Sequence, residues 1–167
     1  EMILPDGAML GSIWGTSSDN IYGAGYVPAV YHWDGVEWST VNLSTPDDDN
    51  LIVVQVWGSG PNDVFAAGWY MWSPYGDGQK VAVVFHFDGS EWTEMLTSGD
   101  WLQPSALWGS GPDNVYMAVG FYGNDGPCIV HYDGEVWAPS MMCEDSHYGY
   151  DERSEERRVG KECATGC

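Results

Sequence analysis

One pattern occurs three times in the 167-residue chain and restricts the possible folds more than any other feature. Each copy begins with Trp-Gly, passes through a turn with Asp or Asn to an apolar-aromatic pair, and ends in His-aromatic-Asp-Gly and a closing Trp. The opening tryptophans are Trp14, Trp57 and Trp108, so the copies start 43 and 51 residues apart. Periods of about 40–50 residues with short strands are typical of β-propeller blades, which stack to complete a core.

Turn signals divide each copy into four short strands. Asp-Gly follows the third expected strand in every copy, and this dipeptide is a strong hairpin signal. We therefore expect an all-β chain with antiparallel four-stranded blades at residues 12–43, 51–96 and 105–141, and with residues 1–11 as the remnant of a preceding blade. A β-trefoil, which also contains three repeats, is the alternative fold.

The residues that recur in all copies are expected to support the fold. Tryptophan packing explains the aromatic positions, and Asp in an Asp-Gly turn accepts hydrogen bonds from its own backbone. The recurring His32, His86 and His131 are interpreted as structural hydrogen-bonding groups rather than metal ligands. The structural frame comprises Trp14, Trp57, Trp108, Asp34, Asp88, Asp133, Trp38, Trp92 and Trp137.

This frame resembles the propeller repeats of many bacterial extracellular and cell-envelope proteins, written Trp-Gly…Asp-Val-(Tyr/Phe)…Val-Gly…His-(Tyr/Phe)-Asp-Gly…Trp. It is similar in outline to kelch, BNR and photosystem-assembly-factor-like propellers, and the resemblance covers residues 12–141. The resemblance implies a propeller fold and a secreted or cell-surface location, but no particular activity. Because a propeller closes with four to eight blades, we expect further blades to be missing from this fragment.

The charge of the chain excludes some partners. The chain contains 25 acidic and five basic residues, which give a net charge of −20. Lys80 is the only basic residue before Arg153. Such a surface repels phosphate groups, so we expect neither nucleic acid nor anionic lipid as a partner. No apolar run is long enough for a membrane-spanning helix.

Two stretches outside the frame are candidate binding sites. Trp69, Tyr70, Trp72 and Tyr75 crowd into a Gly- and Pro-rich insertion of the second copy, which predicts an exposed aromatic surface for a sugar ring or an apolar peptide. The alternative is that this segment folds back over its own sheet. Asp47, Asp48 and Asp49 lie between the first two copies and could ligate Ca²⁺, although a solvated acidic loop is the alternative.

These observations favour a non-enzymatic binding or structural module that recognises protein or carbohydrate. The alternatives are a propeller enzyme, such as a glycoside hydrolase or lyase, and a calcium-stabilised adhesion module. No residue is assigned a catalytic role, and Ca²⁺ is the one cofactor considered.

The C-terminal part of the chain raises two further points. Cys128 and Cys143 could form a disulfide in an oxidising compartment, or could be two small buried apolar residues. Residues 153–163 resemble the translation of a sequencing-library adapter, so we expect residues 152–167 to be a non-native or disordered tail. A genuine charged tail is the alternative.

Overall fold

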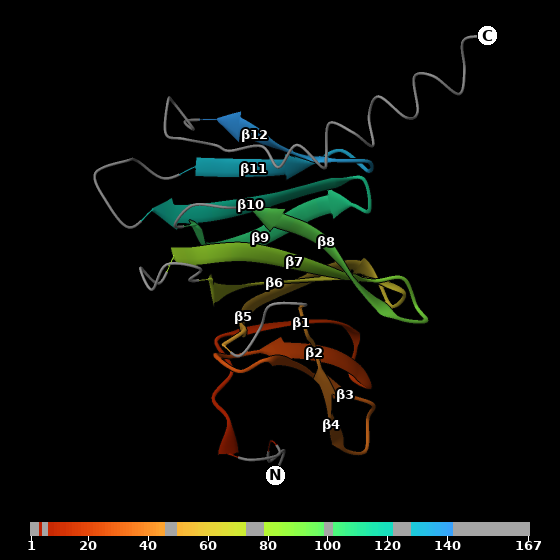
Figure 1. Cartoon of the computed structure of the whole chain (residues 1–167). Coiled ribbons are helices and arrows are strands. Elements are labelled where there is room, and N and C mark those ends of the chain that lie inside the picture. Colours follow the sequence, from red (N-terminus) through yellow and green to blue (C-terminus); the bar gives the residue numbers. More distant parts are fainter. Residues whose placement is uncertain are drawn as a thin grey trace, which may run out of the picture.

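Twelve strands form three separate four-stranded antiparallel sheets in the computed structural model, which describes residues 4, 7–45, 50–72, 79–98, 102–121 and 128–141 (Figure 1). The first sheet contains β1 (Ser12–Ser17), β2 (Asn20–Ala24), β3 (Ala29–Trp33) and β4 (Trp38–Asn42). The second contains β5 (Ile52–Gly60), β6 (Asp63–Trp72), β7 (Gln79–Phe87) and β8 (Trp92–Ser98). The third contains β9 (Leu102–Gly111), β10 (Asn114–Phe121), β11 (Cys128–Tyr132) and β12 (Trp137–Met141).

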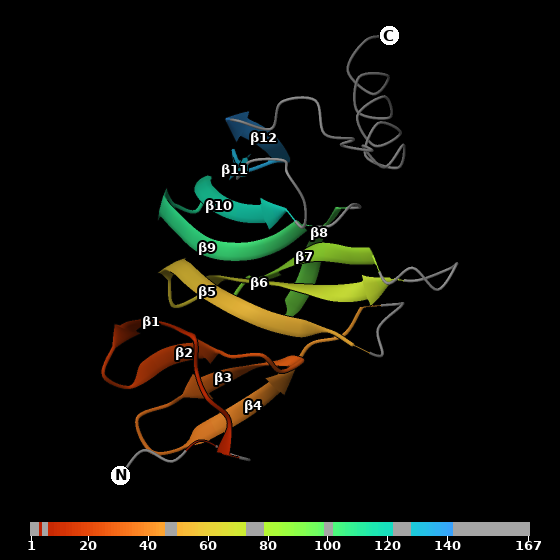
Figure 2. The ribbon, with the colours of Figure 1, turned by 90° about the vertical axis from the view of Figure 1, so that its left-hand side faces the viewer.

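Each sheet is built from strands that are consecutive in the chain, and the sheets stack one upon another (Figures 1 and 2). The first strands of neighbouring sheets lie in contact, β1 with β5 and β5 with β9. Among the described strands, the isolated bridge between Val27 and Val53 is the one β-pairing that joins two repeats. The all-β prediction with three four-stranded antiparallel sheets is confirmed, and the arrangement is consistent with propeller blades rather than a trefoil.

The second sheet is covered on both faces, as its apolar sequence requires. Every residue from 64 to 70 in β6 is buried. Because side chains alternate across a strand, Val64 and Ala66 enter the core shared with the first sheet, while Phe65 and Ala67 enter the core shared with the third. This alternation places one apolar core between each pair of neighbouring sheets.

A tryptophan from one sheet meets a glycine from the next at both of these interfaces. A Cβ atom built on Gly58 would lie 2.7 Å from Cη2 of Trp14, and one built on Gly109 would lie 2.5 Å from Cη2 of Trp57. Glycine at these positions therefore allows the indole ring to approach the backbone of the following sheet.

Aromatic pairs on the third and fourth strands of one sheet pack against the second strand of the preceding sheet. Phe87 and Trp92 stack with ring centroids 5.4 Å apart, and both lie against Tyr22 at 6.4 and 6.3 Å. The same arrangement recurs at the next interface, where Tyr132 and Trp137 lie 5.8 and 6.4 Å from Phe65. The repeated aromatic residues thus contribute to both interfaces between sheets.

Candidate functional site

The three Asp-Gly turns are capped in the same way. Asp34 Oδ1 accepts hydrogen bonds from the N–H groups of Val36 and Glu37 at 2.8 and 2.9 Å. Asp88 and Asp133 accept from the residues two and three positions later at 2.8 to 3.0 Å. The glycines that follow have φ values of 95°, 96° and 94° at Gly35, Gly89 and Gly134.

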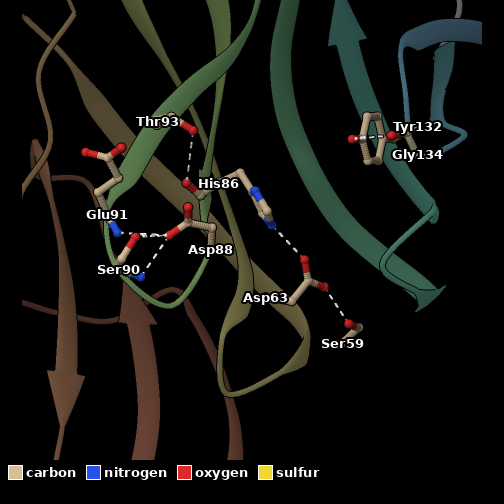
Figure 3. Close-up of polar contacts among 9 residues, drawn as sticks. All are labelled: Ser59, Asp63, His86, Asp88, Ser90, Glu91, Thr93, Tyr132 and Gly134. Carbon is tan, nitrogen blue, oxygen red and sulfur yellow. Dashed lines mark hydrogen bonds and ion pairs between the residues drawn. The ribbon is translucent and has the colours of Figure 1, made fainter.

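Hydrogen bonding lowers the pKa of the capping carboxylates. The hydroxyl of Ser90 also donates to Asp88 Oδ1 at 2.6 Å, as Figure 3 shows. This bond, together with those from the N–H groups of Glu91 and Ser90, lowers the pKa of Asp88 from 3.8 to about 2. Backbone N–H donors likewise lower the pKa of Asp34 and Asp133. The recurrent acids therefore stabilise hairpins on the surface of each sheet.

Each repeated histidine bonds to the residue that begins the second strand of its sheet. Nε2 of His32 lies 2.7 Å from Asn20 Oδ1, and the ring stacks on Tyr22 with centroids 4.5 Å apart. The equivalent polar pairs are His86 with Asp63 at 2.6 Å and His131 with Asn114 at 2.7 Å. Burial lowers the pKa of His32, although the nearby Asp34 opposes this effect.

In the second sheet, a hydroxyl, a carboxylate and an imidazole form a continuous chain (Figure 3). The Ser59 hydroxyl donates to Asp63 Oδ2, and Asp63 Oδ1 bonds to His86 Nε2. A nucleophilic triad requires the imidazole between the hydroxyl and the carboxylate, so that it can take the proton. Here the carboxylate is central, and Ser59 has no contact with the base. The arrangement therefore joins β5, β6 and β7 but does not activate Ser59.

The first and third sheets contain an uncharged version of this row of hydrogen-bonded side chains, with Asn in place of Asp63. Asn20 Nδ2 donates to Thr16 Oγ1 at 2.8 Å, and Asn114 Nδ2 donates to Ser110 Oγ at 2.6 Å. In each case the amide oxygen faces the histidine. The amide or carboxylate at this position thus has the same structural role in all three sheets.

For two aromatic residues of the insertion, the structure agrees with the alternative that this segment folds over its own sheet. Strand β6 continues to Trp72, and Trp69 and Tyr70 are buried, with 9% and 5% of their surface exposed. Nearby Gly and Pro residues are typical of a loop, but the long pairing of β6 with β7 keeps Trp69 and Tyr70 inside the sheet stack. The Lys80 ammonium lies 4.1 Å from the centroid of the Trp69 ring.

The remaining candidate residues are only partly located. Trp72 ends β6, but its side chain is outside the described residues, as are Tyr75 and the candidate calcium ligands Asp47, Asp48 and Asp49. Within the described ranges, no three His, Cys, Asp or Glu side chains are grouped to hold a metal ion. The same residues contain no helix long and apolar enough to cross a membrane.

An open groove of about 530 Å³ lies between the hairpin ends of the first and second sheets. On the first sheet it is lined by Thr16, Ser17, Asp19, Asn20, Tyr22 and His32; on the second it is lined by Pro61, Asn62, Phe87 and Gly89. Asp19 supplies the one carboxylate among these residues, whereas amide and hydroxyl groups supply most other polar atoms. The groove offers hydrogen-bond donors and acceptors beside an aromatic surface.

Sequence reasoning did not identify this groove because its two walls come from different repeats. The turn residues on each wall were interpreted only as loop-forming groups. The sequence does contain a signal for this groove. Polar turn residues, and an aromatic residue directly before Asp-Gly, recur at fixed positions in every repeat. Stacking of consecutive sheets brings those positions together.

No protein-family model matches the chain, and no curated protein matches it.

Proposed function

We propose that the chain is a non-catalytic recognition module of a secreted or cell-surface bacterial protein, of the kelch- or BNR-like propeller type, and that it binds carbohydrate. The observation that supports this proposal is the groove between the first two sheets, where polar side chains from one sheet face Phe87 of the next. Sugar rings pack on aromatic side chains, while their hydroxyl groups exchange hydrogen bonds with amides, hydroxyls and carboxylates.

The charge of the protein favours a neutral glycan. The net charge is −20, and no Lys or Arg is among the residues that line the groove. An anionic sugar or phosphorylated ligand would therefore be repelled.

The chemistry of the groove favours binding over hydrolysis. Glycoside hydrolases generally place two carboxyl groups on either side of the scissile bond. Asp19 is the one carboxylate among the lining residues, and Ser17 donates a hydrogen bond to it at 2.5 Å. This arrangement can accept a hydrogen bond from a sugar hydroxyl but lacks a second carboxyl group.

The disulfide bond of Cys128 supports the proposed location outside the cytoplasm. Cys128 is fully buried and disulfide-bonded. Such bonds persist in oxidising compartments and are rare in the cytosol.

A glycan array probed with the full chain, followed by calorimetric titration of the best ligand, tests the proposal. Asn62→Ala removes an amide from the groove and should weaken binding about tenfold, as expected for one lost hydrogen bond of about 1.4 kcal/mol. Asp113→Ala is the matched control, because Asp113 has the same contact with its hairpin glycine but is not among the groove residues.

The two variants also define the results that would contradict the proposal. An array without a bound neutral glycan, or equal loss of affinity in both variants, would remove the groove as a carbohydrate site. Release of shortened glycan during incubation would instead support the enzymatic alternative.

A further inference from the structure

Tyr22 in β2 combines a buried ring with a hydroxyl group that has no partner in the described part of the chain. The residue is 5% exposed and is one of those that line the groove between the first and second sheets. No described side chain or backbone group forms a hydrogen bond with its hydroxyl. The hydroxyl is also not among the described polar atoms that are fully enclosed without a partner, so it opens on the groove. A ligand in the groove can therefore reach it.

Packing between the sheets does not require this hydroxyl. The equivalent residue of the second sheet is Phe65, which is fully buried. The ring of Tyr22 lies 4.5 Å from His32, and the ring of Phe65 lies at the same distance from His86. Each ring also contacts the aromatic pair of the following sheet, at 6.4 and 6.3 Å for Tyr22 and at 5.8 and 6.4 Å for Phe65. A phenyl ring thus makes the same contacts without a hydroxyl.

The Tyr22 hydroxyl lowers the stability of the empty protein. A polar group that is withdrawn from water loses hydrogen bonds that nothing in the described chain replaces. Burial also raises the pKa of Tyr22 above 10, so the hydroxyl keeps its proton and can both donate and accept a hydrogen bond. A ligand that carries a hydroxyl group would supply the missing partner.

The groove combines the Tyr22 hydroxyl with an aromatic ring and with further polar groups that can bind a ligand. Phe87 lies with its ring centroid 6.4 Å from that of Tyr22. The side-chain amide of Asn62 makes no hydrogen bond within the described ranges. Asp19 uses one carboxylate oxygen to accept from Ser17 and has the other available. Aromatic carbon beside such groups matches the C–H face and the hydroxyl groups of a sugar.

We propose that Tyr22 determines which sugar the groove accepts, through a hydrogen bond between its hydroxyl and one hydroxyl group of a neutral sugar whose ring packs on Phe87. This role rests on the carbohydrate-binding function proposed above. A sugar without a hydroxyl at that position would leave the Tyr22 hydroxyl unpaired beneath the ligand. Sites that hydrogen-bond a ligand hydroxyl reject analogues that lack it, because the polar group of the protein is then left without a partner. The groove therefore distinguishes neutral sugars by the position of one hydroxyl.

The corresponding place between the second and third sheets does not offer this group. Phe65 stands there in the position of Tyr22. Tyr132 stands in the position of Phe87, and its hydroxyl already donates to the carbonyl oxygen of Gly134 at 2.9 Å. The proposed recognition is therefore restricted to the first of the two described interfaces.

Calorimetric titration of the full chain with neutral oligosaccharides of glucose, galactose, mannose and N-acetylglucosamine tests the proposal. Tyr22→Phe removes only the hydroxyl and should weaken binding about tenfold. Tyr116→Phe is the matched control and should leave the affinity unchanged. Tyr116 has the same position in the third sheet and stacks on His131 at 4.3 Å, but it is not among the groove residues.

Stability measurements show whether weaker binding results from a loss of folding. Urea denaturation should find Tyr22→Phe at least as stable as the parent, because the variant removes an unpaired polar group from a buried position. A less stable Tyr22→Phe would show that the hydroxyl has a partner within the chain, and this result would overturn the proposal.

Monodeoxy forms of the bound sugar identify the hydroxyl that Tyr22 contacts. One of them should bind the parent about tenfold more weakly than the complete sugar does. The same form should bind Tyr22→Phe as well as the complete sugar does, because that variant already lacks the partner. Equal losses in the parent and in Tyr22→Phe for every deoxy form would contradict the assigned hydrogen bond.

Asn62→Ala separates the role of Tyr22 from the proposed function. If Asn62→Ala weakens binding and Tyr22→Phe does not, the groove binds carbohydrate without a contribution from the Tyr22 hydroxyl. That result would overturn the role of Tyr22 and leave the proposed function in place. If no neutral oligosaccharide binds, or if neither variant changes the affinity, the role of Tyr22 and the proposed function are both wrong.

Discussion

The indole ring of Trp14 in the first sheet lies so close to Gly58 in the second that a Cβ atom on Gly58 would be 2.7 Å from Cη2 of the ring. The same Cβ would also lie 2.6 Å from the carbonyl oxygen of Asp63. Neither neighbour can move freely, because one is a packed aromatic ring and the other belongs to the paired strand β6.

Gly58→Ala should therefore destabilise the protein. Overpacking of this kind costs about 1–3 kcal/mol, which urea denaturation can measure. Gly60→Ala is the matched control in the same strand, because a Cβ there meets nothing within 4 Å. Equal stability of the two variants would show that the sheets do not pack through this contact.

The capping carboxylate of Asp88 should make stability depend on pH in the acid range. Its pKa is lowered from 3.8 to about 2 in the folded chain by hydrogen bonds from Ser90 and Glu91. Because the folded pKa is the lower one, the stabilisation is present above about pH 4 and is lost as the pH falls through about 2.

Asp88→Asn keeps the Oδ1 acceptor but removes the titration. The thermal unfolding midpoint should fall less in this variant than in the parent when the pH is lowered from about 5 to about 2. This range spans the pKa shift of Asp88. Parallel pH profiles for the two proteins would contradict the assigned role of the carboxylate.

Asp63 is expected to tolerate replacement by the residue found in the other two sheets. Asp63→Asn keeps an oxygen acceptor for His86 but loses the charge-assisted character of the bond, so stability should fall by about 1 kcal/mol. Asp63→Ala leaves both Ser59 and His86 without this partner and should cost about 2 kcal/mol. Denaturant titration separates the two variants, and the reverse order of stability would refute the common role of this position.

The disulfide at Cys128 should contribute measurably to stability. Cys128 is fully buried against the second sheet, and we expect its partner, which lies outside the described residues, to be Cys143. A bond that closes a loop of about 15 residues stabilises a protein by about 3 kcal/mol. Reductant should lower the unfolding temperature of the parent but not that of Cys128→Ala. Peptide mapping without reduction would identify the partner, and a bond to Cys163 or Cys167 would show that the expected pairing is wrong.

The sheets were predictable from the sequence because their signals are local. Asp-Gly at each hairpin and an apolar-aromatic pair such as Val64-Phe65 predict turn and strand within a few residues. The contact between Trp14 and Gly58, and the groove between Asn20 and Asn62, depend on residues from different repeats. No local pattern specifies such contacts. The choice between an exposed and a buried Trp69 stayed open in the sequence for a related reason, since its burial depends on the length of its partner strand β7.

The three sheets differ in length mainly at one end. Strands β6 and β7 contain 10 and 9 residues, whereas β2 and β3 contain 5 each. The capped hairpins and the histidine pairs all lie at the opposite end, where the repeats superimpose residue for residue in sequence. Each sheet therefore has one end of fixed length, which carries the capped hairpin and the histidine pair, and an opposite end where the strand length varies. We expect that residues inserted at the variable end of a repeat, by natural variation or by design, leave the capped hairpin and the histidine pair at the other end unchanged.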